Sequence, residues 1–259
     1  MTQIKFLGLD AGAAFRQNLG MARDLKLLCT DLDGTVLGDP EGEAAFRAWA
    51  QARPMTLAYV TGRNRDNVLG LVAEGRLPRP DFLVCDVGTT LHDLSDPHNR
   101  LGAHFLGLAP LGWPAEAIRA AGQHERTPLQ GPEGQGPYKC SFYWDGDDDS
   151  LVEFMARLAP LHGWRLIPSA GRYLDILPRP FGKDQAVRFL AAALGLSLAQ
   201  VLVAGDMGND ADMFRIGACG ILPSNALDEA VEAASGSLHY HSRLPAGRGL
   251  LDGIRHFSR

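Results

Sequence analysis

The chain has 259 residues, of which 46% are hydrophobic and 21% charged, and its formal net charge is −5. This composition is typical of a globular protein with one large domain or two small ones. The negative charge argues against a nucleic-acid partner, so an anionic substrate has to be bound by a few local cations. We expect no membrane partner either, because no apolar run approaches the roughly 20 residues of a membrane span.

The cysteines and the N-terminus indicate a cytoplasmic protein. The four cysteines are far apart in the sequence and form no CxxC pair and no zinc-like cluster with histidines. We therefore expect a reducing compartment. We interpret residues 1–24 as a loosely ordered extension without the long apolar segment of a signal peptide, and Met21 is an alternative start.

Four short apolar runs each end in a polar cluster, a pattern typical of strands buried on both faces of a parallel sheet. Helical patterns lie between them. Alternating strands and helices predict a doubly wound α/β fold, in which ligands bind at the carboxyl ends of the strands. In chain order, the predicted elements are Leu25–Thr30, Glu43–Ala52, Met55–Val60, Asp66–Glu74, Phe82–Cys85, Asp184–Leu194 and Val201–Ala204.

The middle of the chain differs, because it is richer in Gly and Pro and mixes both patterns. It predicts an inserted α+β domain over residues 94–178, with a core formed by residues 25–93 and 179–259. The predicted helices of the insert are Ala115–Ala121 and Ser150–Leu158, and its predicted strands are Tyr138–Trp144 and Arg172–Leu177.

The strongest chemical signal is the segment Asp31-Leu32-Asp33-Gly34-Thr35, which follows the first predicted strand. Two unit charges about 4 Å apart repel by ~4 kcal/mol at an effective dielectric constant of about 20. A bound Mg²⁺ would remove that repulsion, since it prefers hard oxygen ligands. The alternative is a turn with two solvated carboxylates, and this motif alone does not exclude it.

Three further motifs fall at predicted strand ends or at a helix start. Thr61-Gly62-Arg63 offers a hydroxyl and backbone N–H groups for phosphate oxygens, and Lys183 begins a helix. The segment from Gly205 to Asp210, GDMGND, adds two carboxylates and Asn209. Each motif is weak alone, but their positions and order together favour a phosphate site.

This order of motifs resembles the haloacid dehalogenase (HAD) phosphatase superfamily. The resemblance implies that Asp31 is the nucleophile and that Asp33 is the general acid and base. It implies an aspartyl-phosphate intermediate and an Mg²⁺ cofactor. The implied phosphate-binding residues are Thr61, Gly62, Lys183 and Asn209, and the implied metal site comprises Asp31, the Asp33 backbone carbonyl, Asp206 and Asp210.

The position and sequence of the insert narrow the resemblance. It lies between the second and third motifs, as in type IIB caps. Several segments resemble sucrose-phosphate phosphatases: Ala58–Arg63, Cys85–Thr89, Pro137–Phe142, Asp175–Pro178 and His239-Tyr240. By this resemblance the substrate-binding candidates are Arg63, Lys139, Arg172 and Asp175. The chain departs from the family pattern at Thr90, where we expect an acidic residue, and at Asp184-Gln185.

We therefore expect a Mg²⁺-dependent phosphatase that hydrolyses a small phosphorylated sugar, with sucrose 6-phosphate as the first candidate. The alternatives are a phosphatase for another glycosyl phosphate, such as a glycosyl-phosphoglycerate, and a phosphosugar mutase. A non-catalytic sugar-phosphate-binding domain is a third alternative. A sugar-phosphate synthase is a possible partner.

Two other features favour structural roles. The acidic run at Asp145 and Asp147–Asp149 faintly resembles a calcium loop, but helix capping is the stronger interpretation. Three tryptophans in the insert offer faces for a sugar, yet core packing is the default for this residue. They are Trp113, Trp144 and Trp164.

Overall fold

The computed structural model describes residues 23–259, so most of the predicted extension, including Met21, lies outside the described residues. A seven-stranded sheet has the order β10-β9-β8-β1-β2-β3-β4 and is parallel except for β4, which runs antiparallel to β3. Its strands are β1 (Leu27–Thr30), β2 (Thr56–Val60), β3 (Phe82–Cys85), β4 (Thr90–Asp93), β8 (Val201–Ala204), β9 (Cys219–Leu222) and β10 (His239–His241).

Helices cover both faces of this sheet because its strands are apolar on both sides. Within β1, Leu28 packs in the same cluster as Phe46, whereas Leu27 and Cys29 pack with Val187 in the other. The predicted doubly wound α/β class is thereby confirmed. One face carries α2 (Pro40–Gln51), α3 (Arg65–Ala73) and α9 (Ala246–Phe257), and the other carries α4 (Arg100–Leu106), α7 (Lys183–Ala193), α8 (Asp228–Ala234) and the 3₁₀ helix η3 (Gly208–Arg215).

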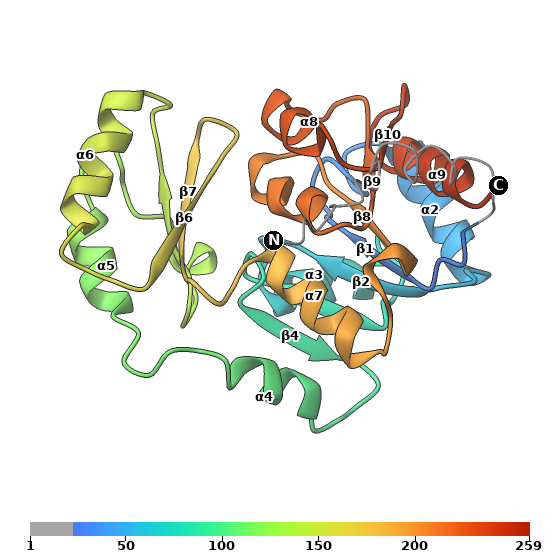
Figure 1. Ribbon diagram of the computed structural model, residues 1–259, viewed down its shortest axis with the longest axis horizontal. Coiled ribbons are helices and arrows are strands. Elements are labelled where there is room, and N and C mark those ends of the chain that lie inside the picture. Colours follow the sequence, from blue (N-terminus) through green and yellow to red (C-terminus); the bar gives the residue numbers. More distant parts are fainter. Residues whose placement is uncertain (1–22) are drawn as a thin grey trace, which may run out of the picture.

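A smaller α+β unit, called the cap below, stands beside the large sheet (Figure 1). Its antiparallel sheet has the order β5-β7-β6, and its helices pack through a cluster that includes Phe142 and Phe154. Asp147 accepts a hydrogen bond from the Ser150 N–H at the start of α6, which confirms the capping interpretation. The cap elements are α5 (Ala115–Gly122), η1 (Pro132–Gly134), β5 (Cys140–Tyr143), α6 (Asp148–Leu158), β6 (Trp164–Ser169) and β7 (Tyr173–Pro178). In the core, the short 3₁₀ helix η2 (Leu198–Gln200) precedes β8.

The first residues of the predicted insert lie against the large sheet. Helix α4 packs on β4, and Phe105 lies 5.2 Å from Phe181, ring centroid to ring centroid. Ala109 still packs on the core cluster that contains Phe105 and Phe181, whereas Trp113 packs on the hydrophobic cluster of the cap. We therefore propose that the cap begins near residue 113 rather than at residue 94.

Polar contacts join the cap to the core. Arg165 on β6 donates to the Phe181 carbonyl at 3.0 Å and to Asp184 Oδ1 at 3.0 Å, and it also pairs with Asp212 on η3. Asp184, one of the departures noted in the sequence, thus anchors the cap beside Lys183. Among the described residues, no helix combines the length and apolarity needed to cross a membrane.

Candidate active site

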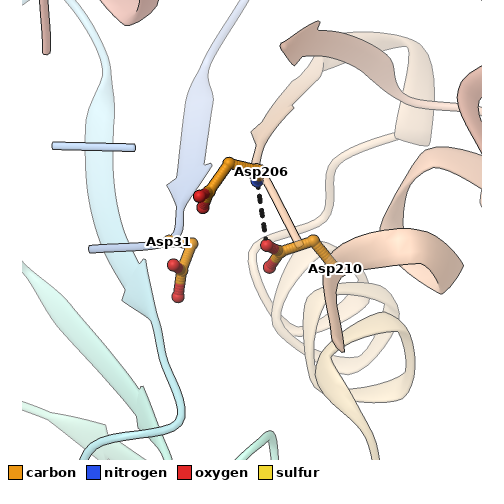
Figure 2. A group of neighbouring side chains, drawn as sticks. All are labelled: Asp31, Asp206 and Asp210. Carbon is orange, nitrogen blue, oxygen red and sulfur yellow. Dashed lines mark hydrogen bonds between the residues drawn. The ribbon is translucent and has the colours of Figure 1, made fainter. Parts of the chain in front are cut away.

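Three buried aspartates meet at the carboxyl edge of the large sheet. Asp31 follows β1, Asp206 follows β8, and Asp210 belongs to η3. Because β1 and β8 are parallel neighbours, their carboxyl ends bring these side chains together. One carboxylate oxygen from each lies within 4.8 Å of the others. Figure 2 shows the three side chains gathered at this edge of the sheet.

Lys183 is the first residue of α7, and its side chain extends into this cluster. Its Nζ donates to Asp31 Oδ1 at 2.8 Å, to Asp210 Oδ1 at 2.7 Å and to Asn209 Oδ1 at 3.1 Å. The side chain is 1% exposed, so its charge is compensated entirely by these neighbours. The structure thus brings together five predicted site residues from three separate motifs: Asp31, Lys183, Asp206, Asn209 and Asp210.

Burial and mutual repulsion shift the pKa values of the cluster. Burial, opposed by Lys183 and reinforced by Asp210, raises the pKa of Asp31 to about 7. Burial, followed by the charges of Asp210 and Asp31, raises the pKa of Asp206 to about 8. For Lys183, burial lowers the pKa, but Asp210 and Asp31 together raise it above its ordinary range. The cluster therefore carries more negative charge than Lys183 alone balances.

Asp210 holds the loop that presents Asp206. Its Oδ2 accepts hydrogen bonds from the backbone N–H groups of Asp206 at 3.0 Å and Met207 at 3.1 Å. Thr35 Oγ1 donates to Asp206 Oδ1 at 3.0 Å, and Thr35 was not among the predicted site residues. Gly34 has φ +76°, and a Cβ there would lie 2.0 Å from Asp206 Oδ2, so only glycine permits this approach.

The donor set fits a hard divalent cation. Asp31 and Asp206 offer carboxylate oxygens, and burial together with the repulsion between neighbouring carboxylates raises their pKa values. Asp210 already uses both oxygens for Lys183 and the backbone, so its contribution is to support the site. The acidic cluster is thus able to bind a metal ion.

The raised pKa values of Asp31 and Asp206 predict how the stability of the metal-free protein depends on pH. The unfolded chain releases these protons near pH 4, whereas the folded protein keeps them to higher pH. The stabilising contribution is therefore complete below about pH 4 and is lost as the pH rises through about 7 to 8. Mg²⁺ should restore it by binding the ionised carboxylates.

Thermal unfolding in EDTA and in Mg²⁺ checks this expectation. The stabilisation by Mg²⁺ should be larger at about pH 8 than at about pH 5. In EDTA, Asp206→Asn should be more stable than the wild type by a margin that grows with pH, since the amide has no proton to lose. A margin that shrinks with rising pH would contradict the assignment.

Asp33 faces the cleft in an ion pair with Arg63. The guanidinium donates from Nε to Asp33 Oδ2 at 2.7 Å and from Nη2 to Oδ1 at 2.6 Å. Arg63, predicted to bind substrate, therefore orients the predicted acid and base in this structure. Thr61 follows β2 and accepts from the Arg63 backbone N–H at 3.2 Å, and Gly62 lines the adjoining cavity.

A cavity of about 500 Å³ lies between core and cap above these residues. Lys139 and the aromatic residues Tyr143 and Tyr173 reach it from the cap, whereas the three tryptophans pack on the cap interior. The core side is lined by Asp31, Asp33, Gly62, Arg63, Asn64, Asn67, Met207 and Asn209, and the cap side by Gln130, Glu133, Gly134, Lys139, Tyr143 and Tyr173.

The other two cap candidates contact residues of the cap sheet. Arg172 is exposed, and its guanidinium carbon lies 5.9 Å from the Tyr143 ring centroid and 5.5 Å from that of Tyr173. Asp175 is buried and accepts a hydrogen bond from Ser141, its cross-strand neighbour. Among the lining residues defined above, neither Arg172 nor Asp175 is included, so their roles in substrate binding stay predictions.

Comparison with known proteins identifies the family. The family model described as sucrose-6F-phosphate phosphohydrolase matches residues 24–258. The chain belongs to this family. It is a sugar phosphatase of the HAD superfamily, which confirms the predicted family and enzyme class. The predicted type of cofactor is consistent with the acidic cluster.

The names of two relatives of this sugar phosphatase refer to different sugar phosphates. The mannosylfructose-phosphate phosphatase of Agrobacterium fabrum is 33% identical, and the match covers 91% of this chain and 98% of that protein. The glucosylglycerol-phosphate synthase of Pseudomonas anguilliseptica is 34% identical, but the match spans 30% of its length and 89% of this chain.

Comparison with solved structures supports the same family assignment. The sucrose-phosphatase of Synechocystis, solved with sucrose and phosphate, superimposes with a TM-score of 0.81 at 27% identity, covering 91% of this chain and 98% of that chain. A HAD subclass IIB sugar phosphatase at 15% identity, covering 88% of this chain and 96% of its own, has a TM-score of 0.61 and shows the shared fold.

Proposed function

We propose that this sugar phosphatase hydrolyses the phosphate monoester of a disaccharide or similar glycoside, with sucrose 6-phosphate as its first candidate substrate. The observation that carries the proposal is the division of the cavity. Asp31 and Asp33 line the core side, whereas aromatic and polar side chains line the cap side together with one cation, Lys139, and one carboxylate, Glu133. A phosphate on the core side would place a sugar against the cap.

The chemistry follows from the residues on the core side. Asp31 attacks phosphorus while Asp33 gives a proton to the leaving sugar oxygen, which breaks the P–O bond and forms an aspartyl phosphate. Asp33 then takes a proton from water, whose oxygen attacks phosphorus and releases phosphate and free Asp31. Lys183 and the Thr61 hydroxyl stabilise the transferring group by charge and hydrogen bonding.

Asp31, Asp206 and the Asp33 backbone carbonyl are the groups that would hold Mg²⁺, with Asp210 supporting them. When bound, the ion supplies positive charge that offsets the repulsion between an attacking carboxylate and a phosphate anion. Ca²⁺ should inhibit, because its higher coordination favours engagement of both Asp31 oxygens.

The relatives leave two substrates to be compared first. The Synechocystis structure supports sucrose 6-phosphate, and the Agrobacterium relative supports a mannosylfructose phosphate. The similarity to the glucosylglycerol-phosphate synthase supports a wider proposal, that a synthase of the corresponding sugar phosphate is a partner. Phosphate release from a panel of these compounds, other hexose and disaccharide phosphates, and glycosyl-phosphoglycerates tests the assignment. Release from none of them would contradict it.

Lys139 should distinguish sugar substrates from small ones. Lys139 lines the cavity, and its Nζ donates to the Gly62 carbonyl at 2.9 Å, so it links the cap to the core side. A charge-assisted contact contributes about 1.5–3 kcal/mol. Lys139→Ala should therefore lower kcat/KM for the sugar phosphate by roughly 10- to 150-fold and change that for p-nitrophenyl phosphate little.

Two outcomes would contradict this role of Lys139. Equal losses on both substrates would place it in the phosphate site or the fold. Unchanged kinetics on both would make it dispensable. Lys26→Ala, at a half-exposed lysine that pairs with Asp24, is the matched control and should behave as the wild type.

A further inference from the structure

A carboxylate outside the proposed catalytic set is buried where the core meets the cap. Asp86 follows β3 directly and is 8% exposed. Thr90 Oγ1 donates to its Oδ2 at 3.3 Å, whereas Oδ1 is buried without a hydrogen-bond partner among residues 23–259. Buried polar atoms in folded proteins are nearly always paired, so an orphan of this kind calls for a bound group.

The backbone around Asp86 is strained. Asp86, Val87 and Gly88 have φ values of +54°, +57° and +86°, and a β-branched residue such as Val87 rarely adopts this region. The turn is held by the Asp86 N–H, which donates to the Arg63 carbonyl, and by the Val87 N–H, which donates to the Thr61 carbonyl, both at 3.0 Å. Such strain persists where the surroundings enforce it, frequently at functional sites.

Lys139 faces Asp86 from the cap. Its ammonium has three donors, but in the described part of the chain only the Gly62 carbonyl accepts from it. A Cβ on Gly136 would lie 3.4 Å from Lys139 Cβ and 3.8 Å from Asp86 Oδ1, so the hairpin containing both cap residues sits directly over the carboxylate. Burial raises the pKa of Asp86, and the charge of Lys139 opposes this rise.

We propose that Asp86 and Lys139 together bind one hydroxyl group of the sugar part of the substrate. A hydroxyl both donates and accepts, so it can donate to Asp86 Oδ1 and accept from Lys139 Nζ. Asp86 belongs to the core and Lys139 to the cap, so one hydroxyl bound by both would link the two units. The assignment rests on the proposed function and deepens it, because it makes Asp86 a specificity-determining residue.

Asp86→Asn tests the assignment with little change in shape, since Asn tolerates positive φ. We expect kcat/KM for sucrose 6-phosphate to fall by about 10- to 100-fold and that for p-nitrophenyl phosphate to stay within about twofold. Monodeoxy analogues of sucrose 6-phosphate then identify the hydroxyl. One analogue should show a similar loss with the wild type and no further loss with Asp86→Asn.

The other outcomes are decisive. Equal losses on both substrates would overturn the assignment in favour of a structural role, as would unchanged kinetics or losses that add for every analogue. Asp66→Asn removes the same charge from a side chain that is 92% exposed, and it should leave both rates unchanged. If the wild type hydrolyses p-nitrophenyl phosphate but no sugar phosphate, the proposed function fails and this assignment fails with it.

Discussion

Asp31→Asn should lower phosphate release by roughly 10⁴-fold or more, because an amide cannot attack phosphorus and nucleophile removal has effects of this size. The fold should survive the change. Burial raises the pKa of Asp31 to about 7, so its neutral form is already accommodated, and an Asn oxygen can still accept from Lys183. Steady-state release of phosphate and thermal unfolding in EDTA measure both effects.

A direct test of the covalent step accompanies this variant. Acid quenching of the wild type with radiolabelled substrate should trap labelled protein, and Asp31→Asn should trap none. Asp24→Asn, at an exposed aspartate, should match the wild type in both assays. A rate for Asp31→Asn above about 1% of the wild type would contradict the covalent mechanism.

Lys183→Met should impair both catalysis and stability. The variant loses the cation that stabilises the transferring group, and we expect kcat to fall by roughly 10²- to 10³-fold or more. It also leaves Asp31 and Asp210 buried without their partner, which typically costs about 3–5 kcal/mol of unfolding free energy. Activity assays and denaturant unfolding in EDTA measure the two losses.

The pH dependence of this destabilisation is informative. Unpaired buried carboxylates ionise at higher pH in the folded than in the unfolded state, so the loss should be largest at high pH and shrink as the pH falls toward about 4. Lys26→Met, at a half-exposed ammonium, is the matched control. A stability loss that grows as the pH falls would contradict the pairing described here.

The core and its active site follow closely from local sequence signals. The apolar runs before Asp31 and Gly205 mark β1 and β8, whose carboxyl ends necessarily meet in a parallel sheet. Helix α2 starts three residues before its predicted position because Pro40 suits the first turn. Helix α9 was not predicted, because Gly247, Gly249 and Gly253 weaken its pattern. A Cβ at Gly247, for example, would lie 2.8 Å from the Gly42 backbone.

Contacts between core and cap were beyond sequence reasoning. Arg165 carries no motif, and its pairing with Asp184 depends on how two separately folded units meet. The Asp33–Arg63 pair lies within the core, where the ends of the neighbouring strands β1 and β2 bring the two residues together, but the motifs did not predict that they pair with each other. The missing acid at Thr90 has a structural counterpart in Asp86, whose carboxylate accepts from the Thr90 hydroxyl.

Phosphate release from sucrose 6-phosphate and the related sugar phosphates, measured with Mg²⁺ and with EDTA, tests the central claim most directly. We predict that free phosphate and free sugar form in equal amounts with Mg²⁺ and that EDTA abolishes the reaction until Mg²⁺ is restored. Transfer of phosphate between sugar positions with little free phosphate, or tight binding of the sugar phosphate without turnover, would contradict it.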